Sequence, residues 1–455
     1  MKIRIFATLL AICLLMSTLL ATSSCGVKDT VGITNAEINE KGELILIYSD
    51  GTEQNLGVVT GKDGADVADG KDGSDGADGA DGENGTGGSV VINSSGSGAT
   101  AASAKGLRSA VSIICKFEAT VQQGGWRPSS GSTTTKQYSS AGSGVIYKLD
   151  KESGDAFIIT NYHVVYDASS NAKNGISRDI SVYLYGSEIE DMGIEATYVG
   201  GSQYYDIAVL RVEDSELLKT SSAVAVTVAD SDDVVAGAGA IAIGNAQGLG
   251  ISTTSGIVSV DSEYITMTAA DGKTEVSFRV MRVDTPINSG NSGGGLYDSE
   301  GNLIGIVNAK IVYDSVENIG YAIPSNVAIS VAENVIDYCF GTDAEKVQRA
   351  LLGITVTTSD SAAVFDPETG LVRIKETVVI HEISKGGVIE GVLLAGDVLL
   401  SATFDGKTYE ITRQHHIIDM MLDVRAGDIV TINIIRDGEQ KSVSVTITED
   451  CLTEY

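Results

Sequence analysis

Three short segments carry residues that could together activate a nucleophile. Ser292 lies in the glycine-rich run Asn-Ser-Gly-Asn-Ser-Gly-Gly at 288–294, His163 follows an apolar run, and Asp206 opens another. A serine hydroxyl is a poor nucleophile at neutral pH, so it needs a base within hydrogen-bond reach and a carboxylate that orients the base. The chain order His163, Asp206, Ser292 therefore predicts a Ser-His-Asp triad that performs acyl transfer.

Each of these residues also has an ordinary structural interpretation when it is taken alone. Most single histidines are structural, an aspartate often opens a strand, and a glycine-rich run is often a turn. His163 is, however, the only histidine between residues 107 and 345. The other histidines lie nearer the C-terminus: His381, His415 and His416. Because three separate coincidences would be required, we interpret the three residues as one catalytic unit.

The glycines around the serine have a role in the same chemistry. Attack on a carbonyl creates an oxyanion, and backbone N–H groups that point at it stabilise the transition state. We expect the N–H groups of Gly290 and Ser292 to form this oxyanion hole, since glycine permits the unusual backbone geometry. Asp206 is expected to hold the tautomer of His163 and to stabilise the imidazolium without becoming protonated.

The elements that must position these residues are mostly strands. From residue 107 to about 325, short β-branched runs such as 143–147 and 303–307 alternate with Gly, Asp and Ser turns. Many short strands at this spacing predict an all-β barrel or sandwich. A helix is predicted over 327–340, capped by Ser325 and ended by Gly341.

Composition limits the possible partners and suggests about three domains for 455 residues. The chain has 31 basic and 61 acidic residues, a net charge of −30. That balance argues against nucleic acid or anionic lipid as a partner, because both need basic patches. The cysteines Cys115, Cys339 and Cys451 are scattered, so they predict neither a disulfide framework nor a metal site. We expect no metal and no cofactor.

The N-terminus is typical of a secretory signal. Charged residues precede the apolar run 5–20, which ends in Ala-Thr-Ser-Ser-Cys-Gly at 21–26. Small residues before a cysteine resemble a bacterial lipoprotein cleavage site, so residues 1–25 are predicted to be a signal peptide with Cys25 lipidated. Ordinary secretion is the alternative. Either way the protein is expected to be extracytoplasmic, with membrane contact through a lipid anchor only.

Two N-terminal segments follow the signal. Residues 26–60 are predicted to form a small β-hairpin module, because Asp50-Gly51 separates two apolar runs. In the spacer 61–106, glycine recurs at every third position from 61 to 88, with Val67 the one interruption. This resembles collagen-like stalks, and the remainder is a Ser/Gly linker. A charged extended spacer, a short triple helix and a calcium site remain open.

Residues 143–325 resemble the HtrA/DegP family of trypsin-fold serine proteases. Seven segments match in family order: Gly142–Ile146, Thr160–Val165, Asp206–Leu210, Ala242–Asn245, Gly256–Ser259, Gly290–Gly294 and Gly320–Ser325. The resemblance implies a mainly β fold, with two six-stranded β-barrels of the chymotrypsin/trypsin type in 107–345. It also implies a homotrimer that cuts unfolded or damaged proteins. The insertion 119–141, with Trp126, matches a variable loop implied to act in regulation and assembly, or it is an irregular surface loop.

The resemblance also bears on specificity. Relatives that cleave after Arg or Lys carry an acid six residues before the nucleophile, where this chain has Pro286. The other expected wall is small and apolar, so we predict cleavage after Val, Ala, Ile or similar residues. The predicted pocket residues are Pro286, Ile287, Val307, Asn308 and Ala309. Ser289 and Gly295 replace prolines that are usual in the family, which loosens the nucleophile loop.

Residues 346–455 resemble the α+β PDZ domain that follows the protease in this family. Leu351, Leu352, Gly353 and Ile354 match the loop whose N–H groups hold a peptide carboxylate, so C-terminal peptides are the implied partners. A generic α/β domain is the alternative. Taken together, the sequence indicates an extracytoplasmic, ATP-independent serine endopeptidase regulated by its PDZ domain. The alternatives are a protease dedicated to one membrane-bound substrate and a non-catalytic surface binding or adhesion protein.

Overall fold

The computed structural model describes residues 33–39, 41, 43–49, 51–58, 98–123, 132–188, 190–309 and 319–455. The chain forms two compact units, residues 1–89 and 90–455, which are described separately. The expected signal peptide 1–25 with Cys25, the glycine repeat 61–88 and Trp126 lie outside the described residues.

The first unit contains a three-stranded antiparallel sheet. Its strands in order are β1 (Ile33–Ile38), β2 (Glu43–Tyr48) and β3 (Glu53–Val58). The turn between β2 and β3 uses Gly51 at φ 82°, with its N–H bonded to the carbonyl of Tyr48 at 3.0 Å. The predicted hairpin therefore has a third strand, β1, that the sequence analysis did not identify.

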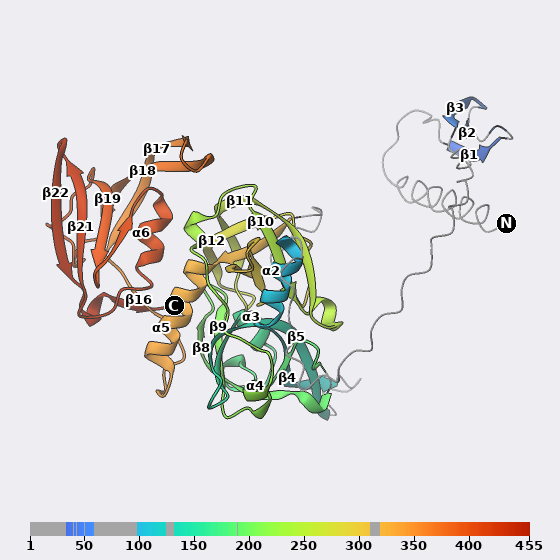
Figure 1. Cartoon of the computed structure of the whole chain (residues 1–455), viewed down its shortest axis with the longest axis horizontal. Coiled ribbons are helices and arrows are strands. Elements are labelled where there is room, and N and C mark those ends of the chain that lie inside the picture. The colour runs from blue at the N-terminus through green and yellow to red at the C-terminus, as the bar shows by residue number, and fades with distance from the viewer. Residues whose placement is uncertain are drawn as a thin grey trace, which may run out of the picture. The chain divides into compact units, whose positions relative to one another are not determined.

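The second unit begins with a helix and a closed six-stranded barrel (Figure 1). The strands, which close in the order β4-β5-β6-β9-β8-β7, are β4 (Ala110–Gln123), β5 (Ser132–Asp150), β6 (Asp155–Thr160), β7 (Asp179–Leu184), β8 (Ile194–Ser202) and β9 (Ile207–Val212). The helices of this part are α2 (Gly98–Leu107), α3 (Tyr162–Val165) and α4 (Glu216–Thr220). Side chains such as Ile113, Ile158 and Leu210 fill the barrel and are at most 1% exposed.

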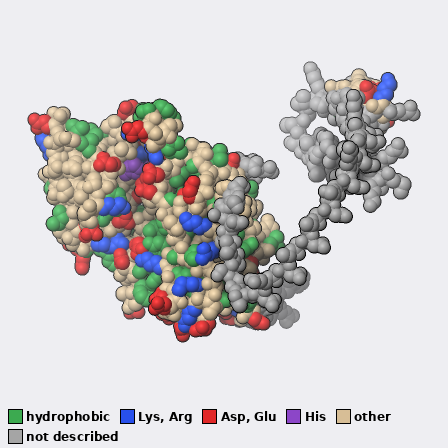
Figure 2. Space-filling model, in the orientation of Figure 1, with side chains coloured by type: hydrophobic (Ala, Val, Ile, Leu, Met, Phe, Trp, Pro, Cys, Tyr) green, Lys and Arg blue, Asp and Glu red, His purple; other side chains and the backbone are tan. Residues whose placement is uncertain are grey.

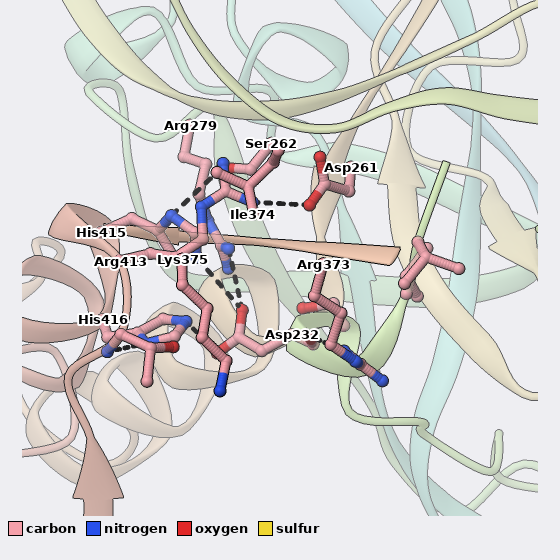
Figure 3. Close-up of a pocket in the computed structure, with 14 residues that line it drawn as sticks. Asp232, Asp261, Ser262, Arg279, Arg373, Ile374, Lys375, Arg413, His415 and His416 are labelled. Atoms are coloured by element: carbon pink, nitrogen blue, oxygen red, sulfur yellow. Dashed lines mark hydrogen bonds and ion pairs between the residues drawn. The ribbon is translucent and has the colours of Figure 1, made fainter. Parts of the chain in front are cut away.

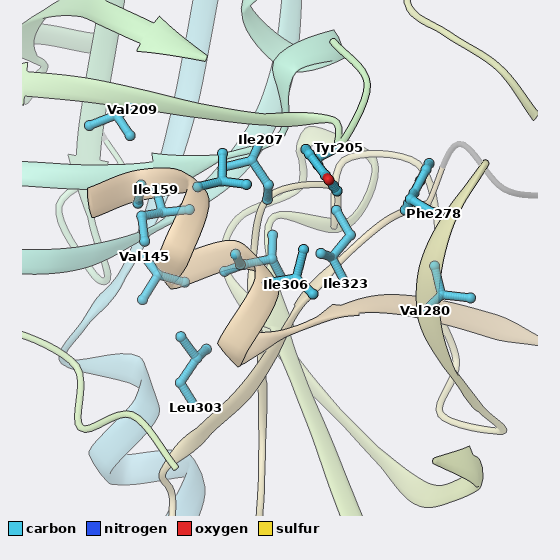
Figure 4. Close-up of a cluster of buried hydrophobic side chains, with 14 of the residues drawn as sticks. Val145, Ile159, Tyr205, Ile207, Val209, Phe278, Val280, Leu303, Ile306 and Ile323 are labelled. Carbon is cyan, nitrogen blue, oxygen red and sulfur yellow. The ribbon is translucent and has the colours of Figure 1, made fainter. Parts of the chain in front are cut away.

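A second closed barrel follows, with strand order β10-β11-β12-β15-β14-β13. Its strands are β10 (Gly239–Gly244), β11 (Ser252–Thr268), β12 (Glu275–Val283), β13 (Gly295–Tyr297), β14 (Leu303–Val307) and β15 (Gly320–Pro324). The largest apolar cluster joins both barrels: Val145 and Ile159 from the first lie beside Ile306 and Ile323 from the second (Figure 4). The expected mainly β fold with two six-stranded barrels is confirmed.

The helix after the second barrel, α5 (Ser325–Cys339), packs Val327 and Val331 into the same cluster. Its position agrees with the prediction, but its start differs. Ser325 is the first helical residue rather than the cap, and its hydroxyl donates to the carbonyl of Ala229 at 2.8 Å. Gly341 follows the helix at φ 74°, a backbone conformation that glycine adopts without strain.

The insertion 119–141 is not an irregular loop where the structure describes it. Residues 119–123 continue β4 and pair in register with residues 132–136 of β5, from Ala119 opposite Lys136 to Gln123 opposite Ser132. The run Ser-Thr-Thr-Thr at 132–135 explains the difference, because β-branched side chains favour paired strands.

The C-terminal part contains a six-stranded sheet, with five strands in the order β17-β18-β19-β21-β22 and the sixth, β20, paired to β19. These strands are β17 (Ile354–Asp366), β18 (Leu371–Ile383), β19 (Val398–Phe404), β20 (Lys407–Glu410), β21 (Ile429–Arg436) and β22 (Glu439–Thr446). A separate pair joins β16 (Gln348–Ala350) to β23 (Leu452–Glu454), and the helix of this part is α6 (Gln414–Met420). Short 3₁₀ turns lie at η1 (Lys173–Gly175), η2 (Glu190–Met192), η3 (Ser231–Asp233), η4 (Ala246–Gly248) and η5 (Glu449–Cys451).

The cysteines in the described residues are free thiols, as their scattered positions predict. Burial raises the pKa of Cys115 to about 12, and nearby Asp179 adds to this effect. Burial likewise raises the pKa of Cys339 to about 11. On the surface, acidic side chains are interspersed with basic ones on the face that Figure 2 shows. Among the described helices, none is long and apolar enough to cross a membrane.

The closed packing of the first barrel predicts the cost of a cavity. Leu210 is fully buried, so Leu210→Ala is expected to lower the free energy of unfolding by about 3 kcal/mol. Urea unfolding of the full chain should show a lower midpoint. The matched control is Val372→Ala, because Val372 is 55% exposed. Equal midpoints for both variants would contradict the barrel interior described here.

Candidate active site

His163 lies one residue into the short helix α3, directly after β6 ends at Thr160. Asn161 joins the strand to the helix, and its side-chain amide donates to the carbonyl of Asp206 at 2.9 Å. The same carbonyl accepts the N–H of Tyr162 at 3.2 Å. The segment that carries His163 is therefore fastened to the start of β9, where Asp206 lies.

Asp206 holds His163 at two points, the imidazole ring and the backbone N–H. Its Oδ2 lies 2.6 Å from Nδ1 of His163, and its Oδ1 accepts the backbone N–H of His163 at 3.0 Å. The Asn308 side chain donates to the same Oδ2 at 2.8 Å. Asp206 is 5% exposed and adopts φ 53°, a strained conformation for a residue with a side chain. The structure thus places the predicted base and its orienting carboxylate together.

Ser292 lies in the loop between β12 and β13. At two nearby positions of this loop, 290 and 293, only glycine fits. A Cβ on Gly290 would lie 2.3 Å from the carbonyl oxygen of Asn245, and one on Gly293 would lie 2.2 Å from that of Ser143. Both glycines have positive φ, at 93° and 84°. The glycine-rich sequence is therefore required by the close approach of neighbouring backbone as well as by its turn.

Ser143 on β5 fastens this loop to the first barrel. Its hydroxyl donates to the carbonyl of Gly290 at 2.7 Å and accepts the N–H of Asn245 at 2.7 Å. Its backbone N–H donates to the carbonyl of Ser292 at 2.8 Å, and its carbonyl accepts the Thr160 hydroxyl at 2.7 Å. Ser143 is fully buried, so water does not compete for these four hydrogen bonds.

The N–H groups of Gly290 and Ser292 were predicted to form an oxyanion hole, and the hydrogen bonds of the loop show whether they are free. The carbonyl of Ser289 accepts the N–H of Gln247 at 2.7 Å. In a trans peptide the carbonyl and the next N–H point in opposite directions, so the N–H of Gly290 points away from Gln247. Within the described residues, neither Gly290 nor Ser292 donates its N–H to another group. Both predicted donors are thus available to a ligand.

The Ser292 hydroxyl accepts the N–H of Ala309 at 3.2 Å and makes no hydrogen bond to His163 among the described residues. Bonds between nucleophile and base are often long without substrate. Asn308 and Ala309 are consecutive, and one bonds the Asp206 carboxylate while the other bonds the Ser292 hydroxyl. This arrangement places acid, base and hydroxyl in one site suited to acyl transfer.

The residues predicted for the specificity pocket lie in different environments. Pro286 is exposed, and its carbonyl accepts the Thr254 hydroxyl at 2.8 Å. Ile287 is partly buried against the cluster that contains the fully buried Val307. In the expected wall of the pocket, Ala309 is partly exposed, whereas the side chain of Asn308 donates a hydrogen bond to Asp206.

The predicted carboxylate loop lies at the start of β17. Leu352 is buried, Leu351 is 37% exposed, and Gly353 adopts φ 75°. The N–H of Leu351 donates to the carbonyl of Cys451 at 2.8 Å, and the carbonyl of Gly353 accepts the N–H of Ser384 at 2.7 Å.

The roles of two residues of this site were not predicted from the sequence. Ser143 lies within the motif Gly142–Ile146, but its role as an anchor depends on contacts with residues far away in sequence. Asn308 was predicted to line the pocket, and its side chain contacts Asp206. For Asn308 the available signal was a polar residue directly after the apolar strand β14, whereas Ser143 lies inside the largely polar strand β5 and has no comparable signal.

Loss of the Ser143 hydroxyl should disorganise the loop that carries Ser292. We expect Ser143→Ala to lower the rate of Ser292 labelling by a fluorophosphonate probe about tenfold, since removing a direct oxyanion donor costs on the order of 10²–10³. Ser139→Ala is the control, because Ser139 lies on the same strand and is exposed. An unchanged labelling rate in a folded Ser143→Ala variant would contradict the anchoring role.

Comparison with known proteins adds independent observations. Residues 142–306 match the family described as trypsin-like peptidase domain. Over 340 residues the chain is 32% identical to a serine protease Do-like HtrA of Lactococcus lactis subsp. cremoris, covering 72% of this chain and 75% of the relative. It is also 32% identical over 329 residues to a serine protease Do-like HtrA of Bacillus subtilis, covering 70% and 66%.

Among solved structures, an HtrA-type protease AlgW with decapeptide shares 25% identity. That alignment covers 77% of this chain and 98% of AlgW at a TM-score of 0.46. The fold, the arrangement of the site and the two sequence relatives agree. The chain belongs to the HtrA family of trypsin-like serine proteases and is a serine endopeptidase.

Proposed function

We propose that Ser292, His163 and Asp206 form the catalytic triad, with Gly290 and Ser292 as the oxyanion hole. The observation that carries this proposal is that two consecutive residues, Asn308 and Ala309, hydrogen-bond the acid and the nucleophile respectively. Asn308 donates to Asp206 at 2.8 Å, and the N–H of Ala309 donates to the Ser292 hydroxyl at 3.2 Å. Asp206 also lies 2.6 Å from the ring of His163.

The proposed reaction follows from these contacts. Because Nδ1 of His163 faces Asp206, Nε2 is the nitrogen that takes the proton as the Ser292 oxygen attacks a peptide carbonyl. The N–H groups of Gly290 and Ser292 stabilise the oxyanion. His163 then protonates the leaving amine, an acyl-enzyme forms, and water hydrolyses it by the same route in reverse. The described residues supply every proton transfer in this scheme.

We further propose that the substrates are unfolded or damaged proteins cut after small apolar residues, without ATP. Pro286 stands where relatives that cleave after Arg or Lys carry an acid, so this position supplies no charge, and the expected wall of Val307, Asn308 and Ala309 is small and uncharged. An uncharged pocket does not compensate the charge of Arg or Lys, because burying an unpaired charge is costly.

The C-terminal segment 346–455 is proposed to be a PDZ domain that captures C-terminal peptides. Strand β17 is an edge of the six-stranded sheet, so its free side can accept a peptide strand. The side chain of Gln414 at the start of α6 donates to the carbonyl of Val356 on β17 at 3.2 Å. A bound peptide would take over this carbonyl, while the loop at Leu351–Ile354 would receive its carboxylate.

The organisation before residue 107 supports an extracytoplasmic setting. We propose that residues 1–25 are a lipoprotein-type signal, that Cys25 carries the lipid anchor, and that residues 26–60 and 61–106 separate the anchor from the protease domain 107–345. Secretion without an anchor is the alternative. We also propose a homotrimer, on the basis of the family resemblance, and no nucleic-acid partner, because the net charge is −30.

Degradation of an unfolded protein tests the proposed nucleophile. Reduced casein should be cleaved by the full chain, and Ser292→Ala should lower the rate by about 10⁶-fold, which is the loss typical of a missing nucleophile. Ser139→Ala controls for substitution of an unrelated serine. Residual cleavage by purified Ser292→Ala at more than a hundredth of the parent rate would exclude Ser292 as the nucleophile.

Mapping of the cleavage sites tests the proposed specificity. Mass spectrometry of the casein fragments should find most cuts after Val, Ala or Ile and few after Lys or Arg. A matched digest with trypsin provides the opposite pattern on the same substrate. Predominant cleavage after basic residues would show that the pocket around Pro286 has been assigned wrongly.

A further inference from the structure

A second cluster of reactive side chains lies away from the active site, where the protease domain meets the C-terminal domain. Asp232 comes from the 3₁₀ turn η3 before β10, and His415 and His416 are consecutive residues in α6. Figure 3 shows the Asp232 carboxylate facing both imidazoles. One possible ligand atom from each of the three lies within 4.8 Å of the other two.

The separations between these atoms are longer than hydrogen bonds. Nε2 of His415 lies 3.6 Å from Oδ1 of Asp232, and Nε2 of His416 lies 4.0 Å from Oδ2. A direct N–H···O bond is normally 2.7–3.2 Å long. Two atoms bound tetrahedrally to one Zn²⁺ at about 2.0–2.1 Å lie roughly 3.4 Å apart. Small side-chain rotations would therefore bring all three atoms to a single ion.

The opposite ring nitrogens are held as metal-binding histidines require. Nδ1 of His416 lies 2.9 Å from the carbonyl of Glu410 and 3.3 Å from the backbone nitrogen of Thr412. The shorter contact, to the carbonyl, favours a proton on Nδ1, and that tautomer leaves the Nε2 lone pair for a ligand. Nδ1 of His415 lies 3.3 Å from the Ser262 hydroxyl, which can accept a proton in the same way. Each Nε2 thus faces Asp232 with its lone pair, an arrangement that a bound cation would stabilise.

A small cavity adjoins the cluster and offers room for a further ligand. It has a volume of about 60 Å³ and is lined by the three residues together with Ser262, Arg279 and Arg413. One water needs only ~10–15 Å³ of such volume. A tetrahedral zinc site with three protein ligands could therefore complete its coordination with water from this side.

Neighbouring cations oppose a metal ion and limit its affinity. Nη1 of Arg279 lies 2.8 Å from Oδ1 of Asp232, although Arg279 also lies 2.8 Å from Asp419. Arg413 is paired with Asp261 at 2.6 Å. Arg373 and Lys375 line the same cavity. Arg373 is paired with Asp233 at 3.2 Å, so three of these four cations have a carboxylate partner, and we expect binding in the micromolar rather than the nanomolar range.

We propose that Asp232, His415 and His416 form a Zn²⁺ site that joins the protease domain to the C-terminal domain. One ligand comes from one domain and two come from the other, so the complete site exists only while the domains are in contact. Binding of the ion should therefore stabilise the docked arrangement, as any ligand stabilises the state that binds it.

The test uses the full-length chain with Ser292→Ala, which prevents self-digestion, after metal is removed with a chelator. Zn²⁺ affinity is measured by competition with a chromophoric chelator, and Co²⁺ is used as a spectroscopic substitute. One Zn²⁺ per chain is expected, with visible Co²⁺ absorption typical of tetrahedral coordination. His416→Gln and Asp232→Asn should each lower the affinity at least tenfold.

His381→Gln is the matched control, because His381 lies exposed on β18 and is not part of the cluster. It should bind Zn²⁺ as the parent does. Zn²⁺ should also raise the thermal unfolding midpoint of the parent and of His381→Gln but not of His416→Gln. Circular dichroism without metal establishes that each variant is folded. If His416→Gln is not folded, Asp232→Asn takes its place as the test variant. No bound Zn²⁺, or equal affinity in folded parent, His416→Gln and Asp232→Asn, would overturn the proposal.

Discussion

The active site depends on the buried hydrogen bonds of Ser143, because they fix the first barrel against the loop of the second. The proposed base and acid, His163 and Asp206, belong to the first barrel, whereas the proposed nucleophile, Ser292, belongs to the second. Sheet hydrogen bonds hold each barrel internally, but they do not set the distance between barrels. Ser143 does so by bonding Gly290, Ser292 and Asn245 from a position on β5. A hydroxyl suits this role, since it can donate and accept at once.

The C-terminal domain is attached through α5 and through a buried cation. Asn334 on α5 donates to the carbonyls of Gln348 at 2.7 Å and Leu422 at 3.3 Å. The Arg279 side chain is 2% exposed and contacts both Asp232 and Asp419, one from each side of the contact. A buried guanidinium is destabilising unless its carboxylates stay in place, so separation of the domains is opposed by charge as well as by packing.

Features that depend on residues close together in the sequence were predicted, whereas features that depend on contacts between distant residues were not. The strands and the helix after the barrels follow from local patterns of apolar and turn residues, whereas the two six-stranded barrels were implied by the family resemblance. The grouping of His163, Asp206 and Ser292 follows from residue types whose chemistry is informative. By contrast, the roles of Ser143 and Asn308 depend on contacts between distant strands, which no local pattern encodes.

The same limit explains the other differences. The extension of β4 and β5 through the insertion was mistaken for a loop because its Ser and Thr residues are polar, although they pair well in strands. The cluster of Asp232 with two histidines was not predicted from the sequence, because its members are brought together only by the contact between domains. Scattered cysteines gave no reason to expect metal binding, and histidine neighbours in one helix are usually structural.

The free thiols described above bear on the surroundings in which the enzyme can operate. With no disulfide among the described residues, folding of the barrels needs no oxidant and no disulfide-exchange catalyst there. Because the pKa of Cys115 is about 12, almost none of its sulfur is thiolate at neutral pH, and the thiolate is the form that peroxides attack. Folding of the described domains therefore does not depend on an oxidising environment, and the barrel interior around Cys115 is protected from oxidation by its own burial.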